Sequence, residues 1–503
     1  MKATVVVNRK FTVGEIDKRI YSSFVEHMGR VVYTGIYEPG HETADADGFR
    51  QDVLEKVKEM GVTGIRYPGG NYVSCYDWRD SVGPVERRPR RLEIAWRAIE
   101  TNEFGINEFM RWAKKADIEP IFAVNLGTKG IENAVSVVEY CNIDKGTLYS
   151  DMRREHGVEK PHGIRTWCLG NEMDGDWQIG HKTAEEYGRL AQETAKAMKQ
   201  VDPSIKLVSC GSSKSDMPTY PDWEAVTLNY TYDYVDYVSL HQYYGNQDKG
   251  TKYFLAQSTD MERYIKTVTG VCDFIKAKKR SDKELYISFD EWGVWSVPDV
   301  EVASQVDESP WQVAPHLSEQ IYSMEDTLLF ASMMMNFLKY ADRIKIACQS
   351  LLTNISAAIM TEEKGGVWVQ PVFYPFSHMA KYGHGTVLQA VTDCDTYDCG
   401  DFKQVPYLDH VTVYNREESE LVLFAVNRSE EEAIELAYEP EGFEPEAVIE
   451  HVMMSHPDKK ATNLKNHAEV APVLHEGTHA EGRQVCAKLP PLSWNMIRVK
   501  VTV

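Results

Sequence analysis

Short apolar segments alternate with longer amphipathic ones from about residue 20 to about residue 350. In the longer segments, such as 184–201 and 324–342, apolar residues recur at helical spacing. Near-continuous apolar strands separated by helices indicate a parallel sheet covered by those helices. The predicted strands are residues 22–27, 64–70, 119–127, 165–172, 206–213, 237–244, 284–291 and 343–350.

Eight strand–helix units predict an α/β protein built on a (β/α)8, or TIM, barrel. A doubly wound sheet is the alternative. It fits less well, because there are eight units and no glycine-rich phosphate loop follows the first strand.

From about residue 385 the pattern changes to short segments in which apolar and polar residues alternate, such as VTVYNR and LVLFAVNR. This alternation is typical of an antiparallel sandwich in which each sheet buries one face. The N-terminal stretch ATVVVNRKFTVG alternates in the same way. We therefore expect N-terminal strands in residues 1–18, a catalytic barrel in residues 19–384, and a jelly-roll-like β-sandwich in residues 385–503 that also takes the N-terminal strands.

Composition narrows the class of partner. The net charge of −21 argues against nucleic acid and anionic membranes, both of which attract basic patches. No apolar run reaches the ~20 residues that span a bilayer, and early charges interrupt any export signal. The nine cysteines are scattered without a CxxC pair, as in proteins with reduced thiols. These features predict a cytoplasmic protein.

Several predicted strands end in residues that make poor turns and good catalysts. In a (β/α)8 barrel the active site lies at the C-terminal ends of the strands. Solvation of the surface would explain any one of these residues, but it explains the whole set poorly. The strand-end residues are Glu26, Arg66, Asn171, Glu172, His241, Tyr243, Asp290 and Glu291.

Glu172 and Glu291 follow the fourth and seventh strands, which lie nearly opposite each other in an eight-stranded barrel. Paired carboxylates are what glycoside hydrolysis requires, one protonated and one ionised. Glu172 has little positive charge near it in sequence, which suits the acid. Arg66 and the hydroxyl of Tyr243 could keep Glu291 ionised. A structural ring of ion pairs at the barrel mouth is the alternative.

Motifs along the chain add a family resemblance. RYPGGNYVSCYDW (66–78), WCLGNEMDG (167–175), LHQYYGN (240–246) and FDEWGVW (289–295) occur in order. With them the chain resembles glycoside hydrolase family 51, the α-L-arabinofuranosidases. The resemblance implies an exo-acting, retaining enzyme that acts on oligosaccharides derived from arabinan and arabinoxylan. The alternatives are a related barrel glycosidase of other specificity, or a carbohydrate-binding protein without activity.

The resemblance also assigns roles. Glu172 would be the general acid/base and Glu291 the nucleophile, with carboxyl groups about 5–5.5 Å apart. No metal or other cofactor would be needed, and the chain would form a homo-oligomer such as a hexamer. The residues expected to bind the sugar or to support the carboxylates are Glu26, Arg66, Asn71, Trp96, Asn171, His241, Tyr243, Trp295 and Gln349.

Some positions depart from the family pattern or suggest other chemistry. Gly293 replaces an asparagine, which predicts a more mobile loop, and the segment 364–376 also differs. Leu351 stands where a glutamine is usual, and Gln349 lies two residues earlier. HEGTH (475–479) matches a zinc-protease pattern, but that pattern requires a helix and this stretch is β-like.

Overall fold

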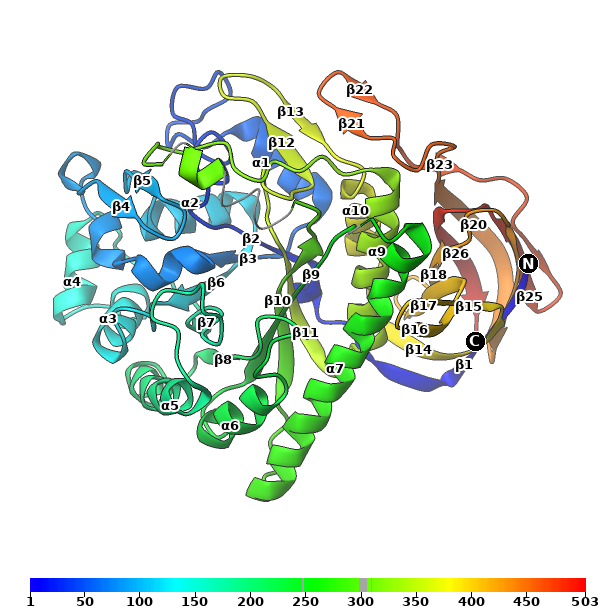
Figure 1. Cartoon of the computed structure of the whole chain (residues 1–503), viewed down its shortest axis with the longest axis horizontal. Helices are drawn as coiled ribbons and strands as arrows, with labels where there is room; N and C mark the ends of the chain where they lie inside the picture. The colour runs from blue at the N-terminus through cyan, green and yellow to red at the C-terminus, as the bar shows by residue number, and fades with distance from the viewer. Residues whose placement is uncertain (247, 298–304, 309) are drawn as a thin grey trace.

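Eight parallel strands of the computed structural model close into a barrel (Figure 1). The structure describes residues 1–246, 248–297, 305–308 and 310–503. Around the barrel the strands follow chain order, and the last pairs with the first, so the predicted fold is confirmed. The strands are β2 (Ser22–Phe24), β3 (Gly64–Tyr67), β6 (Glu119–Val124), β7 (Thr166–Leu169), β8 (Lys206–Cys210), β9 (Tyr237–Tyr244), β10 (Tyr286–Val294) and β11 (Ile344–Gln349).

Helices cover the outer face of the barrel (Figure 1). The predicted helix at 184–201 is confirmed as α5, which the side chain of Thr183 caps by accepting from the Glu186 amide. The α-helices in the described part of the chain include α1 (Gln51–Met60), α2 (Ile106–Ala116), α3 (Ile131–Asn142), α4 (Leu148–Glu155), α5 (Ala184–Val201), α6 (Asp222–Thr231), α7 (Thr251–Lys279), α9 (Met324–Lys339) and α10 (Phe373–Tyr382).

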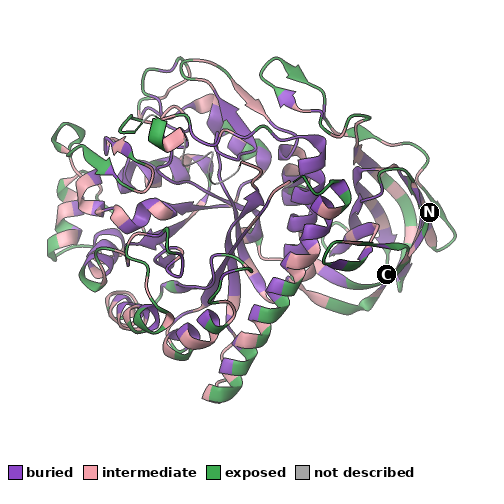
Figure 2. Cartoon of the chain, viewed as in Figure 1, coloured by how far each residue is buried: buried purple, intermediate pink, exposed green. Residues whose placement is uncertain are grey.

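The helix predicted at 324–342 is α9, which ends at Lys339 and is buried on every side from Met324 to Leu338 (Figure 2). It contacts α7 and β10 of the barrel on one side and the C-terminal sheet on the other. A helix enclosed in this way needs apolar residues all round, which explains the run FASMMMNFL.

The C-terminal part is one ten-stranded sheet, in the order β23-β20-β26-β18-β17-β14-β1-β19-β25-β24. Its ends approach each other, because β20 contacts both β24 and β25. The strands are β1 (Lys2–Glu15), β14 (Thr386–Cys394), β17 (Leu408–Asn415), β18 (Glu420–Asn427), β19 (Ile434–Glu441), β20 (Glu444–Met454), β23 (Val473–Leu474), β24 (His479–Glu481), β25 (Gln484–Leu489) and β26 (Ser493–Thr502).

The N-terminal strand belongs to this sheet, as the alternation predicted. β1 pairs antiparallel with β14 and parallel with β19, which brings both ends of the chain to the same domain (Figure 1). Val5 and Val7 project from β1 into the core between the two sides of the sheet. The domain limits at residues 18 and 384 stay predictions.

Short helices and two-stranded hairpins lie outside the barrel strands and the ten-stranded sheet. The segment 475–478 is not helical and leads into β24, so the expectation against a zinc-protease helix is confirmed. In the described part of the chain no helix is long and apolar enough to cross a membrane. The remaining elements are η1 (Lys18–Tyr21), η2 (Asn71–Cys75), η3 (Trp78–Ser81), η4 (Val85–Arg87), and the hairpins β4 (Arg91–Glu93) with β5 (Ala98–Glu100), β12 (Ile359–Thr361) with β13 (Val367–Val369), β15 (Thr396–Cys399) with β16 (Phe402–Pro406) and β21 (Asn463–Leu464) with β22 (His467–Ala468).

A buried ionic cluster joins the sheet to the barrel helices. Asp409 of β17 accepts from Arg428 at 2.6 Å and from Lys339 of α9 at 2.6 Å. Arg428 also donates to Ser258 of α7. Burial by itself raises the pKa of Asp409, but the two cations hold it well below its usual range. The cluster therefore fixes the position of the sheet against α7 and α9.

We expect Asp409→Ala to destabilise the protein by about 3–5 kcal/mol at neutral pH, because it leaves two buried cations unpaired. The measurement is the apparent melting temperature at several pH values. Because the folded pKa of Asp409 is lowered, its stabilisation is present above the unfolded pKa of ~3.9 and is lost below it. The difference in stability between variant and parent should therefore shrink in acid.

Asp398→Ala, which breaks an exposed pair with Lys403, is the control and should change stability by less than ~1 kcal/mol. Equal melting temperatures for Asp409→Ala and the parent at neutral pH would contradict the assignment.

Candidate active site

A β-bulge in β10 brings two consecutive acids into the barrel mouth. Ser288 pairs with Ser239 of β9, but the next pair joins Glu291 to His241, so β10 holds one extra residue. β10 also holds one extra residue relative to β11, between the pairs Phe289–Ala347 and Trp292–Gln349. Neighbouring residues of a regular strand point to opposite faces, and a bulge lifts this restriction. As a result Asp290 and Glu291 both face the same charged groups.

The end of β7 presents Glu172 through a tight change of backbone direction. Gly170 has φ +91°, and Glu172 itself lies in the left-handed region at φ +44°. That region disfavours residues with a Cβ, and such strain is typical of functional sites. The Glu172 carboxylate accepts from Nδ1 of His241 at 3.0 Å and from the indole N–H of Trp177 at 2.6 Å. The strained turn thus directs Glu172 toward His241 of β9, two strands along the barrel from β7.

The two glutamates lie close together at the mouth. A carboxylate oxygen of Glu172, one of Glu291 and a ring nitrogen of His241 lie within 4.8 Å of one another. Glu291 accepts from Arg66 at 2.7 Å and from the hydroxyl of Tyr243 at 2.8 Å. A separation of about 5–5.5 Å fits nucleophilic attack by one carboxylate, whereas inversion through a bound water needs about 6.5–9.5 Å.

The electrostatic environments of the acids differ. Burial raises the pKa of Glu172, and the charge of Glu291 raises it further. Burial also raises the pKa of Asp290, but Arg66 and the hydrogen bond from His241 bring it below its ordinary value. Glu291 is itself paired with Arg66, while no arginine or lysine among the described residues is paired with Glu172. The site therefore favours a proton on Glu172 and negative charge on Asp290, while Glu291 faces the Arg66 guanidinium.

His241 links these acids as a cation. Burial alone would lower its pKa, but Glu291, Asp290 and Glu172 together raise it to about 10. Its Nδ1 faces Glu172 at 3.0 Å and its Nε2 faces Asp290 at 3.1 Å. With a pKa of about 10 the ring is a cation at neutral pH, so both ring nitrogens carry protons and each can donate to the acid that it faces. A doubly protonated ring cannot ligate a metal ion, and the arrangement works as a charge network.

Glu26 and Trp96 meet on the other side of the mouth. Glu26 accepts from the Tyr72 amide at 2.8 Å and from the indole of Trp96 at 3.0 Å. Burial raises the pKa of Glu26 to about 8, with a contribution from the charge of Glu291. A carboxyl group that is neutral at pH 7 can donate a hydrogen bond to a hydroxyl group.

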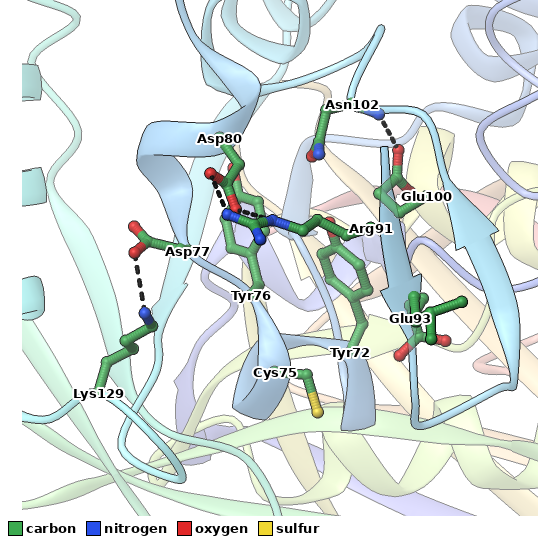
Figure 3. A pocket seen from close by; sticks show the side chains of 11 residues that line it. Tyr72, Cys75, Tyr76, Asp77, Asp80, Arg91, Glu93, Glu100, Asn102 and Lys129 are labelled. Atoms are coloured by element: carbon green, nitrogen blue, oxygen red, sulfur yellow. Dashed lines mark hydrogen bonds and ion pairs between the residues drawn. The ribbon is translucent and has the colours of Figure 1, made fainter. Parts of the chain in front are cut away.

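A polar cavity of about 240 Å³ lies beside the β4–β5 hairpin (Figure 3). Glu93 lines this cavity and accepts from the backbone N–H of Trp96 at 2.7 Å. Ion pairs of Asp80 with Arg91 and of Asp77 with Lys129 line the same cavity (Figure 3). The Asp80–Arg91 pair connects β4 to η3, and Glu93 connects β4 to the backbone of Trp96.

The asparagines form a polar chain next to Arg66. Asn171 accepts from Arg66 at 2.7 Å and donates to Gln178 at 3.2 Å and to Asn71 at 3.4 Å. Asn71 begins η2, directly after Gly70. The fixed amides leave little rotational freedom, so they can recognise hydroxyl groups at set positions.

Tyr243 connects Glu291 to two further side chains. Its ring meets that of Trp295 edge to face at 5.5 Å, and its hydroxyl bonds to Ser350 at 2.7 Å. Gln349 is fully buried, where its amide donates to the Ser356 carbonyl at 3.1 Å and accepts from Ser23 at 3.3 Å. A sugar-binding role for Gln349 stays a prediction.

Four contacts of this site were not assigned from sequence. Trp177 lies two residues beyond the motif WCLGNEMDG, and Asp290 stands out in sequence only as a strand end. Nothing in the sequence pattern indicates Ser350 or Glu93. Ser350 lies far along the chain from its partner Tyr243. Glu93 lies in β4, and its partner Trp96 lies in the turn between β4 and β5.

The chain is similar to known proteins along nearly its whole length. Two family models match, an α-L-arabinofuranosidase 1 domain at residues 56–266 and an α-L-arabinofuranosidase C-terminal domain at residues 290–493. The intracellular exo-α-(1→5)-L-arabinofuranosidase 1 of Bacillus subtilis is 53% identical over 99% of both chains. An exo-α-(1→6)-L-arabinofuranosidase of Bifidobacterium longum is 45% identical and covers 99% of this chain and 97% of its own.

A solved structure of a family 51 α-L-arabinofuranosidase from Bifidobacterium longum superposes with a TM-score of 0.94. It is 39% identical and covers 99% of both chains. Similarity of this extent includes every barrel strand and the whole C-terminal sheet. The chain therefore belongs to glycoside hydrolase family 51, the α-L-arabinofuranosidases.

Proposed function

We propose that this protein is an exo-acting, retaining α-L-arabinofuranosidase that releases terminal arabinofuranosyl residues from oligosaccharides. The observation that carries the proposal is the close approach of Glu172 and Glu291, with oxygens within 4.8 Å, in unlike electrostatic environments. The relative from Bacillus subtilis is named intracellular, which supports a cytoplasmic enzyme here. Such an enzyme meets short oligosaccharides from arabinan or arabinoxylan rather than the polymers.

In the first step Glu291 acts as the nucleophile. Arg66 and Tyr243 each donate to a different oxygen of Glu291, which orients the carboxylate. It forms a covalent bond to the anomeric carbon while the bond to the leaving-group oxygen breaks. Glu172 gives its proton to that oxygen, so the leaving group departs as an alcohol.

In the second step Glu172 acts as the base. Once Glu291 has become an ester it no longer carries charge, and one cause of the raised pKa of Glu172 is removed. Glu172 is then suited to accept a proton from water, which attacks the anomeric carbon and frees Glu291. Two displacements at the same carbon retain its configuration. His241 stays between the two acids and balances their charge in both steps.

The sugar-binding groups follow from the polar chain at the mouth. Glu26, Asn71 and Asn171 would bind the furanose hydroxyls, and Trp96 and Trp295 would line the walls. A site built for hydroxyl groups rejects analogues that lack them, because its own buried polar groups are then unpaired.

The names of two relatives suggest which glycosidic linkage the enzyme cleaves, and the more similar relative is the better guide. An α-(1→5)-linked arabino-oligosaccharide is the preferred substrate of this proposal, as in the name of the relative that is 53% identical. The relative named for α-(1→6) linkages is 45% identical. Product analysis on both linkages tests this choice. Assembly as a homo-oligomer such as a hexamer stays a prediction.

The two glutamates should respond differently to azide. On 4-nitrophenyl α-L-arabinofuranoside we expect Glu291→Ala to lose at least ~10³-fold of kcat, and azide to restore turnover with an arabinosyl azide of inverted configuration. Glu172→Ala should still release 4-nitrophenol in a burst, since this leaving group needs no proton. Azide should then give the product of retained configuration.

The measurements are stopped-flow kinetics and NMR of the azide products. Hydrolysis at the parent rate by Glu291→Ala would exclude the nucleophile assignment. Inverted product from the Glu172 variant would show that the roles are exchanged.

Trp177→Phe should change the pH profile. The indole N–H stabilises ionised Glu172, so its removal should raise the pKa of Glu172 and move the alkaline limb of kcat/KM upward by as much as about one pH unit. The alkaline limb shifts because the first step needs protonated Glu172. Trp368→Phe is the control, since its indole N–H has no hydrogen-bond partner in the described part of the chain. An unmoved alkaline limb in Trp177→Phe would rule out this role.

Gly70→Ala should impair the sugar site without unfolding the protein. A Cβ at Gly70 would lie 2.4 Å from Oε2 and 2.9 Å from the carboxyl carbon of Glu26, so the carboxyl group must move. Misplacement of a binding group by about 1 Å can cost 10²-fold, and we expect kcat/KM to fall by about that factor. Gly40→Ala, where the added methyl meets nothing within 4 Å, should leave kcat/KM unchanged. Full activity in Gly70→Ala would show that the position of Glu26 does not matter.

A further inference from the structure

Three side chains with metal-ligating atoms gather on the hairpin of β24 and β25. Ligand atoms of His479, Glu481 and Cys486 all lie within 4.8 Å of one another. The hairpin forms one end of the ten-stranded sheet, on the side of the molecule away from the barrel (Figure 1). The cluster therefore has no part in the proposed catalytic site.

The register of the hairpin explains why these residues meet. His479 is paired with Cys486 across the two strands, and Glu481 is paired with Gln484. Glu481 follows His479 by two positions, so both project from the same face of β24. Gly482, at φ +60°, and Arg483 form a two-residue turn that holds this register. The alternate residue, Val485, is buried on the opposite face.

The distances suit a small tetrahedral ion. Zinc binds sulfur at about 2.3 Å and nitrogen or oxygen at about 2.0–2.2 Å, which places ligand atoms about 3.5 Å apart in a tetrahedron. The Cys486 sulfur lies 3.9 Å from Oε2 of Glu481. Rotation of exposed side chains closes a difference of this size without moving the backbone, because His479 and Glu481 are exposed and Cys486 is half-buried.

A second observation concerns the tautomer of His479. Its Nδ1 lies 2.9 Å from the carbonyl oxygen of Gly477. A carbonyl oxygen only accepts, so Nδ1 carries a hydrogen, and Nε2 is the nitrogen that the neutral ring can offer to a metal ion. Histidine ligands of metal ions usually donate their other nitrogen in this way, which fixes the ring for binding.

We propose that the β24–β25 hairpin binds a borderline divalent cation, with Zn²⁺ the best fit, through His479, Glu481 and Cys486. Water completes the tetrahedron, since the cluster faces solvent. Thiolate, imidazole and carboxylate together select zinc over Mg²⁺ and Ca²⁺, which prefer oxygen ligands alone. Binding releases the thiol proton of Cys486, so affinity falls as the pH is lowered. The bound ion would link β24 to β25 and stabilise the end of the sheet.

The site differs from the one that HEGTH resembles. That pattern would pair His475 with His479 on one helix face, but the ring of His475 packs against His451 at 4.8 Å. The two histidines therefore serve as a matched pair of variants, one inside the proposed site and one outside it. Cys399, also half-buried and free, is the matched control for Cys486.

The test is titration of the full-length, reduced protein with Co²⁺ and then Zn²⁺. A cobalt–thiolate bond gives a charge-transfer absorption that the cluster of Glu172, His241 and Glu291 cannot give, because it has no thiol. We expect one equivalent of Co²⁺ to produce this band and Zn²⁺ to displace it. Cys486→Ser should abolish the band, and His479→Ala should weaken Zn²⁺ binding at least tenfold.

The controls Cys399→Ser and His475→Ala should leave the band and the affinity unchanged. Zn²⁺ should also slow hydrogen exchange of the 479–486 amides, while Cys486→Ser keeps the parent kcat/KM. The proposal is overturned if the parent shows no thiolate band, if the band persists in Cys486→Ser, or if exchange slows only in the barrel. None of these results bears on the arabinofuranosidase assignment.

Discussion

The active site depends on the hydrogen bonds and ion pairs of the buried Arg66 guanidinium. It is 1% exposed, donates to Glu291 and Asn171, and lies 3.5 Å from Asp290. A buried charge is tolerated only when it is paired, so the position of Arg66 requires ionised partners around it. Arg66 and protonated His241 face Asp290 and Glu291, while burial favours the protonated forms of Glu172 and Glu26. One network thus sets both the geometry and the protonation of the mouth.

The C-terminal sheet supports this network from a distance. α9 lies between the sheet and the barrel and contacts β10, which carries Glu291, and β11, which follows it. The backbone N–H of Met324, the first residue of α9, donates a hydrogen bond to the carbonyl oxygen of Ala461 in the C-terminal part. Because interiors are closely packed, a shift of the sheet would be transmitted to these strands. The sheet therefore supports the barrel strands through α9 and acts by packing rather than by supplying residues to the site.

Much of the candidate site could be predicted because strand ends are visible in sequence. Glu172, His241, Tyr243 and Glu291 all follow apolar runs, and parallel strands of one barrel bring their ends to one face. Trp177 could not be assigned, since its contact with Glu172 arises only after the turn at Gly170 folds back. Asp290 beside Glu291 should point away in a regular strand, and only the bulge in β10 brings it to Arg66.

The sequence by itself determined the barrel, the C-terminal sheet, the entry of β1 into it, and the pair of glutamates that the family motifs contain. These features depend on local periodicity and on residue type, which are readable along the chain. Only the tertiary structure decided which partner each acid meets, where the protons lie, and that His479 meets Cys486 rather than His475. Those outcomes depend on bulges, register and burial, because pairing across strands and desolvation are set by groups distant in sequence.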